Sequence, residues 1–157
     1  MKARLGVIGG LAVAMLAASG AATAGELEGP ARFCGYSPII DLLSGENVKT
    51  LSGGIHGGTF RWTGDFGSLE VNGIGWASKP KGRVALKRNA KGYTRFAERR
   101  DNGKYVVALW NGAHGAAYFS SAKPITDPQL AAIDRVVLFE EGQEPQGCKL
   151  RTIFSWE

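Results

Sequence analysis

Glycine interrupts this chain at short, irregular intervals, and no other feature restricts its fold as strongly. Of its 23 glycines, 19 lie beyond residue 24, about twice the share in average proteins. Between them lie short runs rich in β-branched and aromatic residues, which favour strands, whereas glycine marks turns. The pattern therefore predicts a β protein with strands over residues 59–63, 68–72, 83–88, 93–99, 104–110, 116–120, 136–140 and 149–156.

The most definite local prediction is a β-hairpin around Asp101-Asn102-Gly103. Asn-Gly is typical of hairpin turns, because both central positions need a positive φ. The run before the turn, residues 93–99, alternates in polarity, which indicates that one of its faces is exposed to solvent. The run after it, residues 104–110, is more continuously apolar. This predicts a central strand that is covered on both sides.

Two segments carry helix signals. In the first, Ser37 is a candidate N-cap, Pro38 takes the first helical position and an apolar stripe covers residues 39–43. The second begins with the capping box Thr126-Asp127-Pro128-Gln129 and should extend to about residue 135. Together the signals predict the α+β class: a predominantly antiparallel β-sheet, either open, curled or barrel-like, with one or two short helices.

Residues 1–24 predict a signal peptide rather than part of the fold. Lys2 and Arg4 form a positive n-region, an apolar run follows, and Ala22-Thr23-Ala24 is a small-residue cleavage site. The apolar run has about 14 residues, whereas a membrane-spanning helix needs roughly 20. We therefore expect one β-rich domain over residues 25–157, periplasmic or secreted, with no transmembrane segment after cleavage.

The two cysteines, Cys34 and Cys148, lie near opposite ends of the predicted mature chain. In an oxidising compartment an isolated pair predicts one disulfide bond. Closing so long a loop is worth about 4 to 5 kcal/mol by the loop-entropy model. A catalytic redox pair is not expected, because the C-x-x-C spacing that lowers a thiol pKa is missing.

Positive charge is concentrated in one segment. Loss of Lys2 and Arg4 with the signal lowers the formal net charge from +5 to +3. The segment from Lys79 to Lys104 nevertheless holds ten basic residues against two acidic ones. Such a segment would contact a polyanion of the cell envelope, a glycan or an acidic protein. The alternative is a solvated hairpin with basic outward positions.

Both histidines of the chain, His56 and His114, fit the pattern G-x-H-G-[GA]-x-[FY]. Flanking glycines leave an imidazole accessible to a ligand or a proton. If the rings converge, they would act as base and acid in phosphodiester cleavage. Alternatively they would hold Zn²⁺ or Cu²⁺, with Asp65 or Glu70 as a third ligand. The structural interpretation is that they mark two equivalent turns of a pseudo-symmetric sheet.

Large aromatic side chains are frequent, and several lie near the histidine turns. Exposed rings would suit sugar stacking or a protein partner, whereas buried rings would fill the core. The candidate ligand-binding residues are Trp62, Trp110, Tyr118 and Arg61.

Familiar catalytic motifs are missing from the sequence. It contains neither a G-x-S-x-G nucleophile elbow nor a phosphate-binding glycine loop. We therefore predict a small exported binding or inhibitory module without a cofactor. A hydrolase or nuclease that uses His56 and His114 is the first alternative, and a metal-binding protein that uses the same pair is the second.

Overall fold

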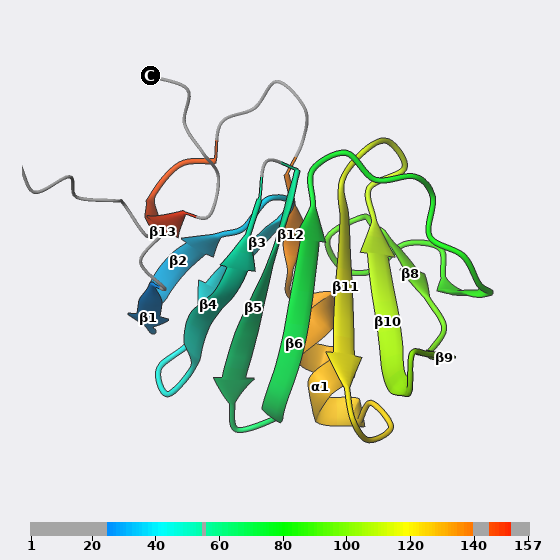
Figure 1. Cartoon of the computed structure of the whole chain (residues 1–157), viewed down its shortest axis with the longest axis horizontal. Coiled ribbons are helices and arrows are strands. Elements are labelled where there is room, and N and C mark those ends of the chain that lie inside the picture. Colours follow the sequence, from blue (N-terminus) through cyan, green and yellow to red (C-terminus); the bar gives the residue numbers. More distant parts are fainter. Residues whose placement is uncertain (1–24, 55, 140–144, 152–157) are drawn as a thin grey trace, which may run out of the picture.

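The computed structural model describes residues 25–54, 56–139 and 145–151, and these form two sheets and one helix (Figure 1). Nine strands make the larger sheet of the described chain, and all its pairings are antiparallel. In spatial order they are β1 (Glu26–Glu28), β4 (Asn47–Gly53), β5 (Gly57–Gly64), β6 (Gly67–Ile74), β11 (Ala116–Ser121), β10 (Lys104–Trp110), β8 (Thr94–Phe96) and β7 (Val84–Leu86), with β9 (Arg99–Asp101) also paired to β10. The sheet is open, with β1 and β7 at its edges, which removes the barrel-like alternative.

The smaller sheet consists of β12 (Val137–Leu138), β3 (Pro38–Leu42), β2 (Ala31–Cys34) and β13 (Cys148–Arg151), in that order. Only the β2–β13 pairing is parallel among the described strands. The predicted disulfide bond Cys34–Cys148 is confirmed, with a Cα–Cα distance of 5.7 Å across the β2–β13 pair. It joins the first and last parts of the domain, 114 residues apart in sequence.

Side chains of the large sheet alternate between two faces. On its inner face, a row of apolar residues crosses from β5 to β10 through the register Phe60, Val71, Phe119 and Val107. These residues pack with Phe33 and Ile40 of the small sheet and with Ile133 of the helix to form the core. The outer face carries the intervening residues of the same strands. The α+β class, dominated by antiparallel sheet, is therefore confirmed.

The predicted hairpin is confirmed. Lys104 pairs with Asp101, so that Asn102 and Gly103 form the two-residue turn with φ angles of 50° and 80°. Strand β10 lies between β11 on one side and β8 and β9 on the other, which confirms the central strand. The preceding run does not form one strand, because β8 ends at Phe96 and β9 begins at Arg99.

One of the two predicted helices forms. The helix α1 (Asp127–Asp134) has Thr126 as its N-cap, and Thr126 and Gln129 complete the reciprocal capping box. The helix predicted after Ser37 is wrong, because residues 38–42 form β3 instead. Burial in β3 alternates from residue to residue, which is the period of a strand, and the β-branched Ile39 and Ile40 favour this conformation.

An ion pair to a buried carboxylate joins the end of α1 to both sheets. Glu46 is only 7% exposed and accepts hydrogen bonds from the indole Nε1 of Trp62 (3.3 Å) and the backbone N–H of Leu43 (3.1 Å). The guanidinium of Arg135, at the C-cap of α1, donates to its other oxygen and lies 5.5 Å from the Trp62 ring centroid. Both carboxylate oxygens therefore have partners inside the protein.

Two glycines on the inner face allow the β2–β3 turn to approach the large sheet. A Cβ on Gly73 would stand 2.5 Å from the ring of Pro38, and a Cβ on Gly58 would stand 2.6 Å from the ring of Tyr36. Gly58 and Gly73 are direct partners in the β5–β6 register. The glycines around these turns thus have a packing role.

The predicted signal peptide, residues 1–24, lies outside the described residues, as do the predicted strand ends at residues 140 and 152–156. In the described part of the chain, no helix is long and apolar enough to cross a membrane.

Candidate functional site

The outer face of the large sheet carries polar side chains in its centre. In β6, outward Ser68, Glu70 and Asn72 alternate with the buried residues of the core face. The next strand continues the same rows, because Asn72 pairs with Tyr118 and Glu70 pairs with Ser120. This face of the sheet is therefore polar and able to form hydrogen bonds, whereas the opposite face of the same strands is apolar.

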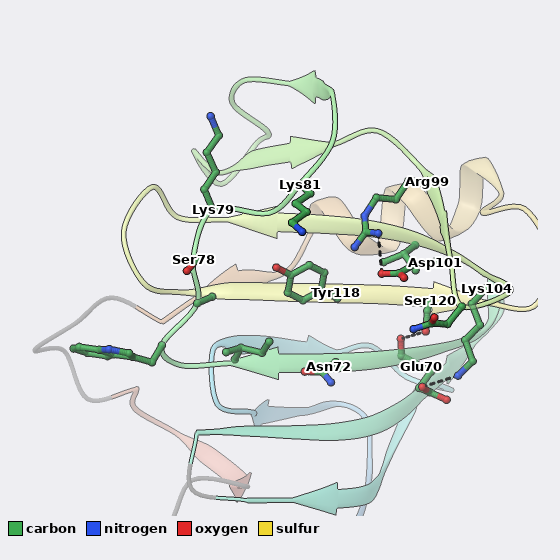
Figure 2. Close-up of a pocket in the computed structure, with 15 residues that line it drawn as sticks. Glu70, Asn72, Ser78, Lys79, Lys81, Arg99, Asp101, Lys104, Tyr118 and Ser120 are labelled. Atoms are coloured by element: carbon green, nitrogen blue, oxygen red, sulfur yellow. Dashed lines mark hydrogen bonds and ion pairs between the residues drawn. The ribbon is translucent and has the colours of Figure 1, made fainter.

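A crossover segment, residues 75–83, leaves β6 and forms a wall beside this polar surface. Its course is fixed by hydrogen bonds from Ala77 N–H to the carbonyl of His114 (2.6 Å) and from Ala97 N–H to the carbonyl of Arg83 (2.8 Å). Between the crossover, the sheet and β9 lies a cleft of about 810 Å³ (Figure 2). We call it the outer cleft. Its polar lining consists of Glu70, Asn72, Ser78, Lys79, Lys81, Arg99, Asp101, Asn102, Lys104, Tyr118 and Ser120.

The charges of the outer cleft do not cancel. Its two carboxylates are each engaged by a cation: Glu70 by Lys104 at 2.8 Å, and Asp101 by Arg99 at 2.7 Å. Figure 2 shows Lys81 pointing from the crossover toward the middle of the cleft, whereas Lys79 points away from it. Lys81 has no ion pair within the described parts of the chain. The cleft therefore offers a net positive, solvated surface.

Tyr118 lies at the floor of the outer cleft and is half-buried. Burial raises the pKa of its phenol above the ordinary value, while the nearby Arg99 cation opposes this shift. The phenol consequently stays protonated at neutral pH and can both donate and accept a hydrogen bond. Asn72, its cross-strand partner, and Ser120, two residues along β11, add further neutral donors and acceptors.

An exposed aromatic side chain ends the outer cleft. Trp76 is 64% exposed, and its indole stacks on the imidazole of His114 with centroids 4.4 Å apart and an interplanar angle of 11°. Trp76 also borders a smaller hollow of about 300 Å³, together with Asn111 and Phe139. A large exposed ring held in a fixed orientation beside a polar cleft provides a stacking surface for a ligand.

The two histidines lie on either side of the end of β6. Ile74 pairs with Gly57 on one side and with Ala116 on the other, so the two histidine turns lead into the two strands that flank β6. The carbonyl of His56 accepts from Gly75 N–H (3.2 Å), just as that of His114 accepts from Ala77 N–H. Their peptides thus hold the backbone on both sides of Trp76, as two equivalent turns would do.

The imidazoles themselves differ in their surroundings. That of His114 stacks on Trp76, whereas that of His56 is exposed and makes no hydrogen bond, ion pair or ring contact with any described residue. Strands β5 and β11 are separated by β6, so their backbones are roughly 10 Å apart. Catalysis by this pair stays a prediction.

The proposed third metal ligands lie elsewhere. Asp65 is in the β5–β6 turn, at the opposite end of the sheet from His56, and Glu70 is four residues along β6 from Ile74 and pairs with Lys104. Among the described residues, no group of three or more histidine, cysteine or carboxylate side chains is placed to hold a metal ion.

The predicted ligand-binding residues separate into two groups. Tyr118 lines the outer cleft, and Arg61 lines a second outer-face hollow beside Glu70 and Lys104. Trp62 is fully buried against Phe66, which removes it from the candidates, because its indole has no surface to offer. Trp110 is half-buried; its Nε1 donates to the carbonyl of Ala113, and Lys79 lies 5.9 Å from its ring centroid.

The basic residues of the segment from Lys79 to Lys104 do not all lie on one surface. Lys79, Lys81, Arg99 and Lys104 line the outer cleft, whereas Lys87, Arg88 and Lys91 are exposed outside it. Arg95 instead pairs with Asp134 of the helix at 3.2 Å. The two aromatics within this segment, Tyr93 and Phe96, are buried and present no stacking surface.

Sequence reasoning did not name Trp76 as a candidate site residue, although it lines the outer cleft. Two signals pointed to it: the alternation of Ser68, Glu70 and Asn72 with apolar residues predicts an outward polar row, and Trp76 follows that row directly, ahead of the Lys79-Pro80-Lys81 loop. No protein-family model, curated protein or solved structure matches this chain. The site must therefore be interpreted from its own chemistry.

Proposed function

We propose that this protein is an exported binding module that binds an acidic carbohydrate in the outer cleft. The observation that carries the proposal is the combination of an exposed, oriented Trp76 with a net positive cleft lined by neutral hydrogen-bonding groups. The signal-peptide pattern and the disulfide bond support a periplasmic or secreted location.

The chemistry of the lining favours a sugar. Tyr118, Asn72 and Ser120 supply donors and acceptors that match ring hydroxyl groups, and the carboxylates of Glu70 and Asp101 are further acceptors for hydroxyl donors. An indole such as that of Trp76 presents a flat apolar face to the C–H face of a sugar ring. The net positive charge, centred on Lys81, then selects a ring that bears a carboxylate or another anionic group.

The same lining disfavours nucleic acid. Proteins that bind single-stranded nucleic acid stack successive bases on several aromatic rings. Here Trp76 is the exposed ring at one end of the cleft, and Tyr118 is half-buried.

Calorimetric titration with polygalacturonate, an acidic polysaccharide, tests the proposal, and dextran is the neutral control. We expect binding to polygalacturonate only, with an affinity that falls as salt is added. Lys81→Glu reverses a charge inside the cleft and should weaken binding about tenfold, which corresponds to about 1.4 kcal/mol.

Lys87→Glu is the matched control, because it makes the same charge change at an exposed lysine outside the cleft. We expect this variant to bind within about twofold of the wild type. If both variants weaken binding equally, the polysaccharide is attracted to the basic segment in general and not to the cleft. If the wild type does not bind polygalacturonate, the proposal is wrong.

A further inference from the structure

We infer that the ligand is a linear acidic polysaccharide that lies extended along β6, rather than a single sugar or a disaccharide held at one point. This inference rests on the proposed function, because it concerns the same surface, and it adds the size and the direction of the ligand.

The outer face carries a continuous trough, of which the outer cleft is only one part. A second hollow of about 390 Å³ lies beside it, lined by Arg61, Ser68, Ser121, Ala122 and Lys123. The two hollows share three lining residues, Glu70, Lys104 and Ser120. A ligand that fills the first therefore reaches the second without leaving the surface of the sheet.

The trough follows one strand. Ile74, Glu70 and Ser68 of β6 lie along it in order, with Ile74 nearest Trp76 and Ser68 in the second hollow. The six residue steps from Ser68 to Ile74 of this antiparallel strand span roughly 20 Å. A surface of this length exceeds what one sugar ring can cover and suits an oligomer.

Recognition groups are present along the whole length of the trough. At one end Trp76 offers its indole, Lys81 lies near the middle of the outer cleft, and Arg61 and Lys123 lie at the other end. Arg61 and Lys123, like Lys81, make no ion pair with the described residues. Cations separated in this way match a polymer whose charges recur at intervals.

The ion pair between Lys104 and Glu70 lies where the two hollows meet (Figure 2). Its side chains are 47% and 36% exposed, so solvent screens the pair and it adds little to the stability of the fold. A ligand carboxylate can therefore replace Glu70 as the partner of Lys104. The pair would then open as the polymer crosses from one hollow to the other.

Oligogalacturonates of increasing length, from the dimer to the decamer, test the inference by calorimetry. We expect affinity to rise with length until the trough is filled. Trp76→Ala and Lys123→Ala change opposite ends, and each should weaken decamer binding about fivefold. The dimer, which occupies one position, should respond to one of these variants at most. Lys149→Ala, at an exposed site in β13, is the control and should change neither affinity.

The outcomes separate the inference from the proposed function. If the dimer binds as tightly as the decamer, the extended ligand is wrong while the acidic-sugar site stands. If only one end variant weakens decamer binding, the trough is not filled along its length and the inference fails. If single-stranded oligothymidylate of equal charge binds more tightly than the decamer, the ligand is a nucleic acid. If no uronate binds, the proposed function itself is wrong.

Discussion

The two faces of the large sheet use polar residues in opposite ways. On the inner face the carboxylate of Glu46 is buried, and both its oxygens accept hydrogen bonds from within the protein, from Arg135, Trp62 and Leu43. On the outer face the carboxylate of Glu70 is partly exposed and has a single, solvated partner in Lys104. Polar groups that the fold requires are satisfied within it, whereas those on the outer face remain available to a ligand.

Two tryptophans show the same contrast. Trp62 is fully buried and donates its indole N–H to Glu46, so its surface is used by the core. Trp76 is mostly exposed and contacts His114 on one face. Trp76 also lines the outer cleft, so its exposed surface is open to a ligand there, which is why we propose it as a ligand-binding residue.

Replacing each glutamate with alanine should separate the two faces most strongly. Glu46→Ala leaves the N–H groups of Trp62 and Leu43 without their acceptor and removes the ion-pair partner of Arg135, and should lower the free energy of unfolding by about 2 kcal/mol. Glu70→Ala removes one exposed ion pair and should change it by less than about 0.5 kcal/mol. Urea unfolding followed by circular dichroism measures both values. Equal losses in the two variants would contradict the division between the faces.

A much smaller effect than that of Glu46→Ala is expected at an exposed ion pair in the small sheet. The guanidinium of Arg32 donates to both oxygens of Asp41, at 2.6 and 2.9 Å, and this hydrogen bonding lowers the pKa of Asp41. A lowered folded-state pKa stabilises the protein above the unfolded pKa of about 4, and this contribution is lost as pH falls through the folded value.

Because Asp41 is 62% exposed, solvent screening limits its contribution to about 0.5 kcal/mol. Asp41→Asn should therefore lower the free energy of unfolding slightly at pH 7, and the difference from wild type should vanish near pH 2. Unfolding curves recorded at both pH values check this. A loss that persists unchanged at pH 2 would show that the carboxylate charge is not its cause.

Much of the fold could be predicted, because its signals are local. The Asn102-Gly103 turn, the Thr126 capping box and the cysteine pair each specify a structure through chemistry that neighbouring contacts reinforce. The helix predicted after Ser37 was wrong because a proline followed by an apolar run also suits a short strand. Pairing with β2 and β12 selects the strand.

The site was harder to predict, because it depends on contacts between distant segments. The sequence places Trp76 in a glycine-rich loop, but its stacking on His114 joins residues 38 positions apart. Likewise, Lys81 and Tyr118 line one cleft only because the crossover folds back over the sheet. The carbonyls of both histidines hold the segment around Trp76, and the imidazole of His114 stacks on Trp76 itself, contacts that the sequence pattern alone does not specify.

The most direct test of the outer-face site is an NMR titration that follows the indole N–H signals of the tryptophans while decagalacturonate is added. We predict that the signal of Trp76 shifts in a saturable way and that the signal of Trp62, buried beneath the same sheet, stays in place. An unchanged Trp76 signal at saturating ligand, or a larger shift of Trp62 than of Trp76, would contradict the assignment of ligand binding to the outer face.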